Sequence, residues 1–251
     1  MLKVAFYMNI GLRKNQEDCI FINGEIYQEN DLKNVKVKEI NNGISMFAVC
    51  DGMGGLSKGE LASKFVCKKL KEEKENFQFS ESYIKDIFKK IQEEFLKTSI
   101  NNSGTTTSGV MIKDYKSLIF NAGDSRVYKI NKNSIKLLSH DHSYVQHLVD
   151  LGYISPDEAK YHPYKNVIEF GIGDVFEDVW KSGNETIFVK EDYLEKGESY
   201  FISTDGVHGV MSESEIFYIL YQNPIENAEE LKKELLKRRE DNLSFIIVHR
   251  L

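Results

Sequence analysis

Four aspartates in this chain stand at the ends of apolar, strand-like runs. Asp51 follows "FAVC" and leads into "GMGG", Asp124 follows "LIFNAG", Asp205 follows "YFIST", and Asp241 comes just before "NLSFIIV". If these runs are strands of shared sheets, their carboxylates converge at one end of the fold. The glycines after Asp51 also predict that the strand ends there and that the backbone turns sharply.

A cluster of this kind favours a metal ion. The stretch "RKNQED" adds Glu17 and Asp18 beside the first strand-like run. Desolvated carboxylates that face one another have raised pKa values and destabilise a fold unless a cation offsets their charge. Hard ions such as Mg²⁺ and Mn²⁺ prefer carboxylate oxygens and backbone carbonyls. Gly52, which has no Cβ, can turn its carbonyl toward such an ion while the chain bends into a helix.

Each motif has a simpler interpretation when it stands alone. An isolated Asp-Gly pair is usually a turn, and Asp241 with Asn242 is typical of a turn or cap before a strand. Asp124 alone could be a hairpin residue paired with Arg126. The "SHDHS" stretch at residues 139–143 could be a metal patch, but we expect a hydrogen-bonded loop near the site. The combination and order of the aspartates favour metal ligands over turns.

Short β-rich runs dominate the chain and predict an α+β fold. The segment 105–138 indicates consecutive antiparallel strands joined by tight turns. Amphipathic helices are expected at about residues 57–74, 82–98 and 227–239, with a loop at 100–104. Strands and helices in separate blocks favour stacked sheets covered by helices. With no repeat and no linker, we expect one domain over residues 1–251.

Composition excludes several classes of protein. The net charge of −6 argues against a nucleic-acid partner, which requires a basic surface. No run reaches the roughly 18 apolar residues of a membrane-spanning helix, so no membrane association is expected. The three cysteines form no Cys-x-x-Cys pair and suit a reducing compartment. A cytoplasmic protein is therefore expected.

Taken in order, "RKNQED", "CDGMGG", "SGTTTSGV", "NAGDSRVY", "SHDHSYVQHLV", "STDGV" and "EDNLSFIIV" resemble the motifs of the PPM-type (protein phosphatase 2C) metal-dependent serine/threonine protein phosphatases. Residues of about 141–185 look like the flap segment of the bacterial subgroup. The resemblance covers nearly the whole chain. It implies a central β-sandwich of two antiparallel sheets with helices on both outer faces, in α-β-β-α layers, and metal ions at one end.

The resemblance also implies the metal ligands, which are the catalytic residues. Asp51 is expected to bridge two divalent ions, Mn²⁺ or Mg²⁺, and Gly52 to offer its backbone carbonyl to one of them. Asp205 and Asp241 are expected to complete the shell of the other ion.

Further positions match the family by motif. Arg13 matches the arginine that binds the substrate phosphate, and Glu17 and Asp18 match acidic residues that act in the outer shell through water. Asp124 and Asn166 are candidates for a weak third ion. Many members carry a second aspartate shortly after the "SDG" motif, whereas "TDGVHGVM" does not, which weakens that third site.

The implied activity is hydrolysis of phosphoserine and phosphothreonine in proteins by a hydroxide that bridges the metal ions, without a covalent phosphoenzyme. The expected partners are phosphorylated proteins, serine/threonine kinases and their substrates, and a monomer is expected. Met53 replaces the histidine of eukaryotic members. One alternative is a catalytically silent pseudophosphatase that binds phosphoproteins or senses divalent ions. Another is a phosphatase of small phosphate esters.

Overall fold

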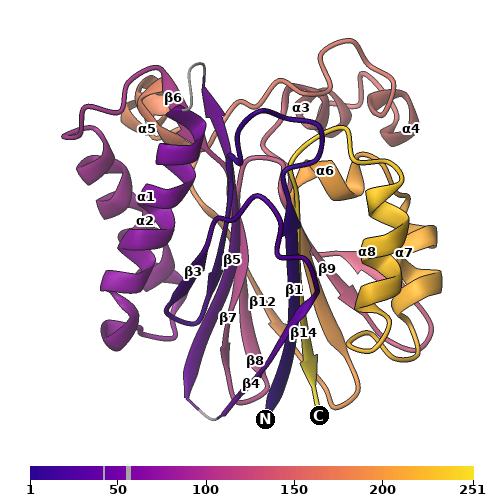
Figure 1. Cartoon of the computed structure of the whole chain (residues 1–251). Coiled ribbons are helices and arrows are strands. Elements are labelled where there is room, and N and C mark those ends of the chain that lie inside the picture. The colour runs from indigo at the N-terminus through magenta and orange to yellow at the C-terminus, as the bar shows by residue number, and fades with distance from the viewer. Residues whose placement is uncertain (42, 55–57) are drawn as a thin grey trace.

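Strand β5 (Ile44–Gly54) shows why the protein is layered. In the computed structural model, which describes residues 1–41, 43–54 and 58–251, Phe47 and Val49 of β5 enter one apolar core while Met46 and Ala48 enter another. A strand that is apolar on both faces must be covered on both. One face of its sheet therefore packs against a second sheet and the other against helices (Figure 1).

Two antiparallel sheets form the centre. The first has the strand order β10-β9-β13-β14-β1-β4, and in the second β11-β6-β5-β7-β8-β12 is extended by β2 and β3 alongside β5. The strands of the first are β1 (Leu2–Asn9), β4 (Lys36–Ile40), β9 (Arg126–Ile130), β10 (Ile135–Leu137), β13 (Ser199–Ser203) and β14 (Leu243–Arg250). The other strands of the second are β2 (Asp18–Ile22), β3 (Glu25–Tyr27), β6 (Ser103–Thr105), β7 (Thr107–Lys113), β8 (Lys116–Ala122), β11 (Ile172–Gly173) and β12 (Phe188–Tyr193).

Helices cover both outer faces, which confirms the predicted α-β-β-α layers (Figure 1). Helices α1 (Lys58–Glu72) and α2 (Glu81–Phe95) pack on the second sheet, and α7 (Glu213–Leu220) and α8 (Ala228–Leu236) on the first. Four short helices lie at one end of the sandwich: α3 (Tyr144–Asp150), α4 (Pro156–Ala159), α5 (Glu177–Ser182) and α6 (Asp205–His208).

Two predictions about local structure are wrong. Strand β5 does not end at Asp51 but continues to Gly54, because its last residues leave β7 and pair with β6. The predicted loop at 100–104 therefore ends early, since β6 begins at Ser103. The predicted start of the first helix at Ser57 lies outside the described residues.

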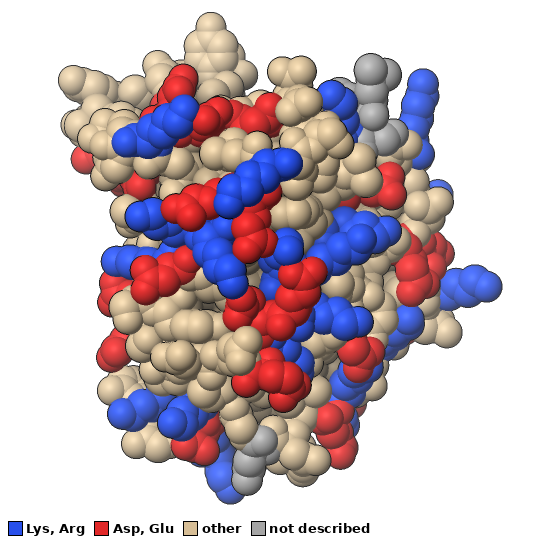
Figure 2. Space-filling view, turned by 90° about the vertical axis from the view of Figure 1, so that its left-hand side faces the viewer, with Lys and Arg blue, Asp and Glu red and all other residues tan. Residues whose placement is uncertain are grey.

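The outer face of α1 and α2 carries charges of both signs. Figure 2 shows lysines and arginines intermixed with acidic residues on this side of the molecule. Lys69 pairs with Glu72 and Glu94 at 2.7 and 2.9 Å, and Lys90 pairs with Glu73 at 2.5 Å. This face is therefore a solvated helical surface.

No helix in the described parts of the chain is long and apolar enough to cross a membrane.

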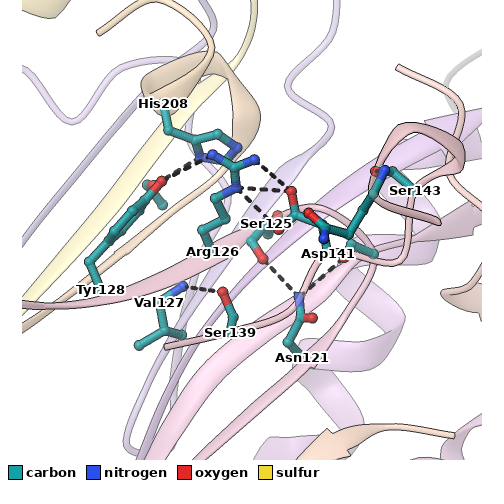
Figure 3. Close-up of polar contacts among 12 residues, drawn as sticks. Asn121, Ser125, Arg126, Val127, Tyr128, Ser139, Asp141, Ser143 and His208 are labelled. Carbon is teal, nitrogen blue, oxygen red and sulfur yellow. Dashed lines mark hydrogen bonds and ion pairs between the residues drawn. The ribbon is translucent and has the colours of Figure 1, made fainter. Parts of the chain in front are cut away.

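A buried ion pair fastens the flap segment, residues 141–185, to β9 (Figure 3). Arg126 donates from Nε to both carboxylate oxygens of Asp141 at 3.1 and 2.9 Å, and from Nη2 to Oδ2 at 2.7 Å. The Asp141 side chain is only 6% exposed. Burial raises the pKa of Asp141 more than Arg126 lowers it, so the carboxylate depends on this arginine for its charge. Arg126 thus pairs with Asp141 rather than with Asp124.

Hydrogen bonds continue from β9 to β5. The hydroxyls of Ser125 and Thr106 lie 2.7 Å apart, and Thr106 Oγ1 accepts from the backbone N–H of Asp51 at 3.0 Å. The amide of Asn121 donates to the carbonyls of Gly123 and Ser125 at 3.3 and 2.8 Å (Figure 3). The turn between β8 and β9 is therefore held from both sides.

The far end of the flap segment is fastened as well. Gln92 of α2 and Gly173 of β11 exchange two hydrogen bonds of 2.9 and 2.8 Å. The carboxylate of Asp174 accepts from the backbone N–H groups of Asn102 and Ser103 at 2.7 and 2.9 Å. The segment is thus tied near its start to β9 of the first sheet and, through Asp174, to β6 of the second sheet.

We expect Arg126→Met to destabilise the protein by about 3–5 kcal/mol, because it leaves the buried carboxylate of Asp141 without its partner. Asp141→Asn is expected to be similarly costly, and the double variant to cost clearly less than the sum. Urea unfolding at pH 7 measures the three free energies. Arg238→Met, which breaks the exposed pair with Glu215, is the control and is expected to change little. Strictly additive costs would contradict a coupled pair.

Candidate functional site

The carboxylates of Asp18 and Asp51 lie directly opposite each other, because these residues pair in the register of β2 and β5. Asp51 has the same parity as Phe47 and Val49, so its side chain enters the layer between the two sheets. Asp18 is fully buried, and its Oδ1 has no hydrogen-bond partner among the residues that the structure describes. The prediction placed Asp18 beside the first strand, and the structure places it inside a strand of the opposite sheet.

The first sheet brings further carboxylates to the same end. Asp205 is the first residue of α6, directly after β13, and Asp241 comes two residues before β14, the neighbour of β13. Thr204 joins the sheets, because its hydroxyl donates to Asp18 Oδ2 at 3.0 Å and accepts from the backbone N–H of Ser244 at 3.1 Å. The convergence expected from the sequence is therefore present.

Burial and mutual repulsion disfavour the charged forms of these groups. Burial is the largest cause that raises the pKa of Asp51, followed by the charges of Asp18, Asp205 and Asp124. Burial, then Asp205, raises the pKa of Asp124. Burial, with added repulsion from Asp205 and Asp241, raises the pKa of Asp18 to about 7. Burial and repulsion thus favour the protonated forms of Asp18, Asp51 and Asp124 when no cation is near.

Gly52 is required by a close approach rather than by a turn. A Cβ on this residue would lie 2.1 Å from the carbonyl oxygen of Gly59 in α1 and 2.7 Å from that of Glu17. The backbone N–H of Gly52 donates to the same Glu17 carbonyl at 3.1 Å. The strand, the first turn of the helix and the acidic loop thus meet backbone to backbone. This replaces the expectation that the glycine serves a bend into the helix.

Two threonines hold the backbone on the other side of Asp51. The carbonyl of Asp51 accepts from Thr106 N–H at 2.8 Å and from Thr105 Oγ1 at 2.9 Å. Thr106 Oγ1 also accepts from the N–H of Asp51 at 3.0 Å. The stretch "SGTTTSGV" was one of the motifs behind the resemblance, but no role was assigned to its threonines. The run of polar residues just before the apolar part of β7 was the available signal.

Arg13 lies beside the cluster. Its Nη2 donates to Asp241 Oδ2 at 2.5 Å, while 58% of its side chain remains exposed. The charges of Asp205 and Glu17 also help to raise the pKa of its guanidinium, after the hydrogen bond to Asp241. Burial raises the pKa of Glu17. A largely exposed guanidinium thus stands beside an acidic cluster.

Asn166 is the predicted site residue for which the structure gives least support. It lies in an exposed turn of the flap segment, at residues 163–166. Asp124, by contrast, lies in the turn between β8 and β9 and feels the charge of Asp205. The structure therefore places Asp124 with the cluster. The role of Asn166 as a ligand of a third ion stays a prediction.

Known proteins share this architecture. The sequence profile described as Protein phosphatase 2C matches residues 4–147. A protein phosphatase 2C-type protein of Streptococcus pyogenes is 29% identical over 99% of this chain and 97% of its own length. The crystal structure of serine/threonine phosphatase Stp1 from Staphylococcus aureus superposes with a TM-score of 0.82, at 26% identity, over 100% of this chain and 96% of that one. The catalytic domain of the phosphatase PstP, in complex with two manganese ions, has the same fold, with a TM-score of 0.73, 20% identity and 99% of both chains covered.

Together these likenesses span the whole chain. The profile covers more than half of the chain, from β1 to α3, and so includes Arg13, Asp51 and Asp124. The solved structure of Stp1 extends the likeness to the rest of the chain, which includes α6 and β14. The chain therefore belongs to the protein phosphatase 2C family of metal-dependent serine/threonine protein phosphatases.

Proposed function

We propose that the aspartate cluster holds two divalent ions, Mn²⁺ or Mg²⁺, with which the protein hydrolyses phosphoserine and phosphothreonine in other proteins. In this proposal Asp51 serves both ions, Gly52 offers its carbonyl to one, and Asp205 and Asp241 serve the other. The observation that carries it is the meeting of buried carboxylates from both sheets, which raise one another's pKa. Bound cations offset such a charge.

The donor set fits hard ions. All its groups are oxygens, and the buried Oδ1 of Asp18 has no hydrogen-bond partner, as expected of an atom that faces an ordered water. Over residues 1–41, 43–54 and 58–251, no three His, Cys, Asp or Glu side chains form a ready-made metal site by themselves. Mg²⁺ and similar ions need no such group, because they keep several waters and take only one or two carboxylates.

The protein's own residues then divide the work. Bound ions of this class supply positive charge opposite the phosphoryl group and lower the pKa of the attacking water. Arg13, which is exposed and already turned toward Asp241, binds the phosphate oxygens with its planar donors. Glu17 and Asp18 accept hydrogen bonds from water in the outer shell and so orient it. The oxygen of water bonds to phosphorus as the ester P–O bond breaks, and a proton from water ends on the leaving oxygen, which becomes the serine or threonine hydroxyl. No covalent phosphoenzyme forms.

A third ion would be weaker. Asp124 is close enough to Asp205 for its pKa to be raised by that charge, and it is the residue that we assign to this site. Asn166 would have to approach from its exposed turn in the flap segment.

We infer that the substrates are phosphorylated proteins, including serine/threonine kinases and their targets. The names of the related proteins, protein phosphatase and serine/threonine phosphatase, support a protein substrate. We also infer a cytoplasmic location, which the three free, buried cysteines support. A monomer is part of the same proposal.

Asp205→Asn is expected to lower kcat/KM at least about 100-fold, because it removes a metal-binding charge and several kcal/mol of transition-state stabilisation. Release of phosphate from a phosphothreonine peptide in Mn²⁺ measures this, and EDTA should abolish the native activity. Asp86→Asn, on the exposed side of α2, is the matched control and should be fully active.

The same assay tests the alternatives. If the folded protein binds the peptide but shows no turnover in Mn²⁺ or Mg²⁺, the proposal fails and the protein is a phosphoprotein-binding module. If p-nitrophenyl phosphate is hydrolysed but phosphopeptides are not, the substrate is a small ester.

Without metal, the protein should become less stable as pH rises from about 4 to about 7. The pKa of Asp18 is about 7 in the folded state and about 3.9 when unfolded. Between these values the folded state binds the extra proton, so the free energy of unfolding falls as pH increases. Saturating Mn²⁺ should remove the decline, because a nearby cation favours the charged form of the Asp18 carboxylate. Thermal unfolding in EDTA and in Mn²⁺ measures both slopes, and a flat Tm in EDTA would sink the argument.

A further inference from the structure

Asn242, just before β14, lies beneath the loop of residues 10–17 that joins β1 to β2. Its Oδ1 accepts from the backbone N–H of Glu17 at 2.7 Å, and its Nδ2 donates to the carbonyls of Ile10 and Asn15 at 2.9 and 3.0 Å. An asparagine amide can donate two hydrogen bonds and accept two. Asn242 is 4% exposed. Three of its four possible side-chain hydrogen bonds go to this one loop, and they hold the two ends of the loop together.

The same loop rests directly on the turn before β14. Gly11 has a φ of +63°, and a Cβ there would lie 2.0 Å from the carbonyl oxygen of Asp241. The N–H of Gly11 donates to Asn9 Oδ1 at 2.8 Å, and the N–H of Arg13 to the carbonyl of Ile10 at 3.3 Å. In Figure 1 the segment after β1 runs beside the one that leads into β14. The loop is therefore seated on this turn by backbone contact as well as by the amide.

Arg13 depends on that seating. Its side chain is 58% exposed, and its guanidinium donates to Asp241, the residue next to Asn242. A long, mostly exposed side chain loses considerable rotamer entropy when it is fixed, so the backbone that carries it must already be in place. An error of about 1 Å in a group that positions a substrate can cost a large factor in rate.

We propose that Asn242 is a positioning residue for substrate phosphate: through the loop 10–17 it sets where Arg13 stands relative to Asp241. The inference rests on the proposed role of Arg13. Asn242 itself touches no substrate. Asp241 and Asn242 are consecutive residues before β14. Asp241 supplies a metal-binding carboxylate, and Asn242 holds the loop of the phosphate-binding arginine, so the same short segment positions both groups.

A purely structural role would move stability but would not depend on Arg13, and this difference makes the proposal testable. We would measure KM for a phosphothreonine peptide, inhibition by inorganic phosphate, and the Mn²⁺ concentration for half-maximal activity. The proteins are the full chain and its Asn242→Ala, Arg13→Ala and double variants. Asn227→Ala is the matched control, because that amide donates to the carbonyl of Ile219 at 2.7 Å, on the α7–α8 side.

We expect Asn242→Ala to raise KM and the phosphate inhibition constant about tenfold, with the Mn²⁺ requirement within about twofold of the native value. In the Arg13→Ala background the same change should add less than about twofold, since the group that it positions is gone. Asn227→Ala should leave KM unchanged in both backgrounds.

Two results would overturn the inference. An equal rise in KM from Asn242→Ala with and without Arg13 would show that the amide acts on the fold alone. A normal KM in Arg13→Ala would remove the proposed role of that arginine, and with it the reason to position it. If Asn242→Ala does not fold, Asn242→Ser, whose hydroxyl can keep one of the bonds, is compared in the same two backgrounds.

Discussion

The rest of the site depends on one unfavourable pair, Asp18 and Asp51, which lie directly opposite each other on neighbouring strands. Like charges in this arrangement repel, and burial between the sheets strengthens the repulsion. Burial of the other side chains of these strands in two apolar cores offsets this repulsion. A site that stores repulsion in the empty protein gains correspondingly from a bound cation, so folding energy and metal affinity are linked at this point.

The surrounding polar groups hold backbone, and the carboxylates are left available. Thr105 and Thr106 bind the peptide groups of Asp51, and Asn242 binds those of the loop that carries Arg13. Side chains that satisfy backbone groups can fix positions without competing for ligands. The catalytic oxygens therefore stand on a frame whose own hydrogen bonds are already made, which is the condition for preorganisation.

The motifs that carried the family resemblance predicted the layers, and the apolar runs next to carboxylates predicted that the aspartates converge. The sequence predicted the end of β5 wrongly, since the glycines after Asp51 are typical of a turn and only pairing with β6 reveals a strand. The part of Asn242 was also missed, because its partners lie more than 200 residues away along the chain. The pair of Arg126 with Asp141 spans fifteen residues and a change of element. Such contacts depend on tertiary structure, which local patterns do not encode.

Thr204 fixes the distance between the two sheets at the site, which the apolar layer between them does not do. Along most of their length the two sheets are held apart by interdigitating side chains, whose spacing adjusts to changes in volume. At the site, a hydroxyl of the first sheet is bonded to a carboxylate of the second, and that distance has little freedom. Substitutions that thin or thicken the core at the far end would therefore tilt the sheets about this fixed end. A substitution in the remote part of the core would then move the carboxylates by changing the angle between the sheets. No chain of direct contacts between the substituted residue and the carboxylates is needed.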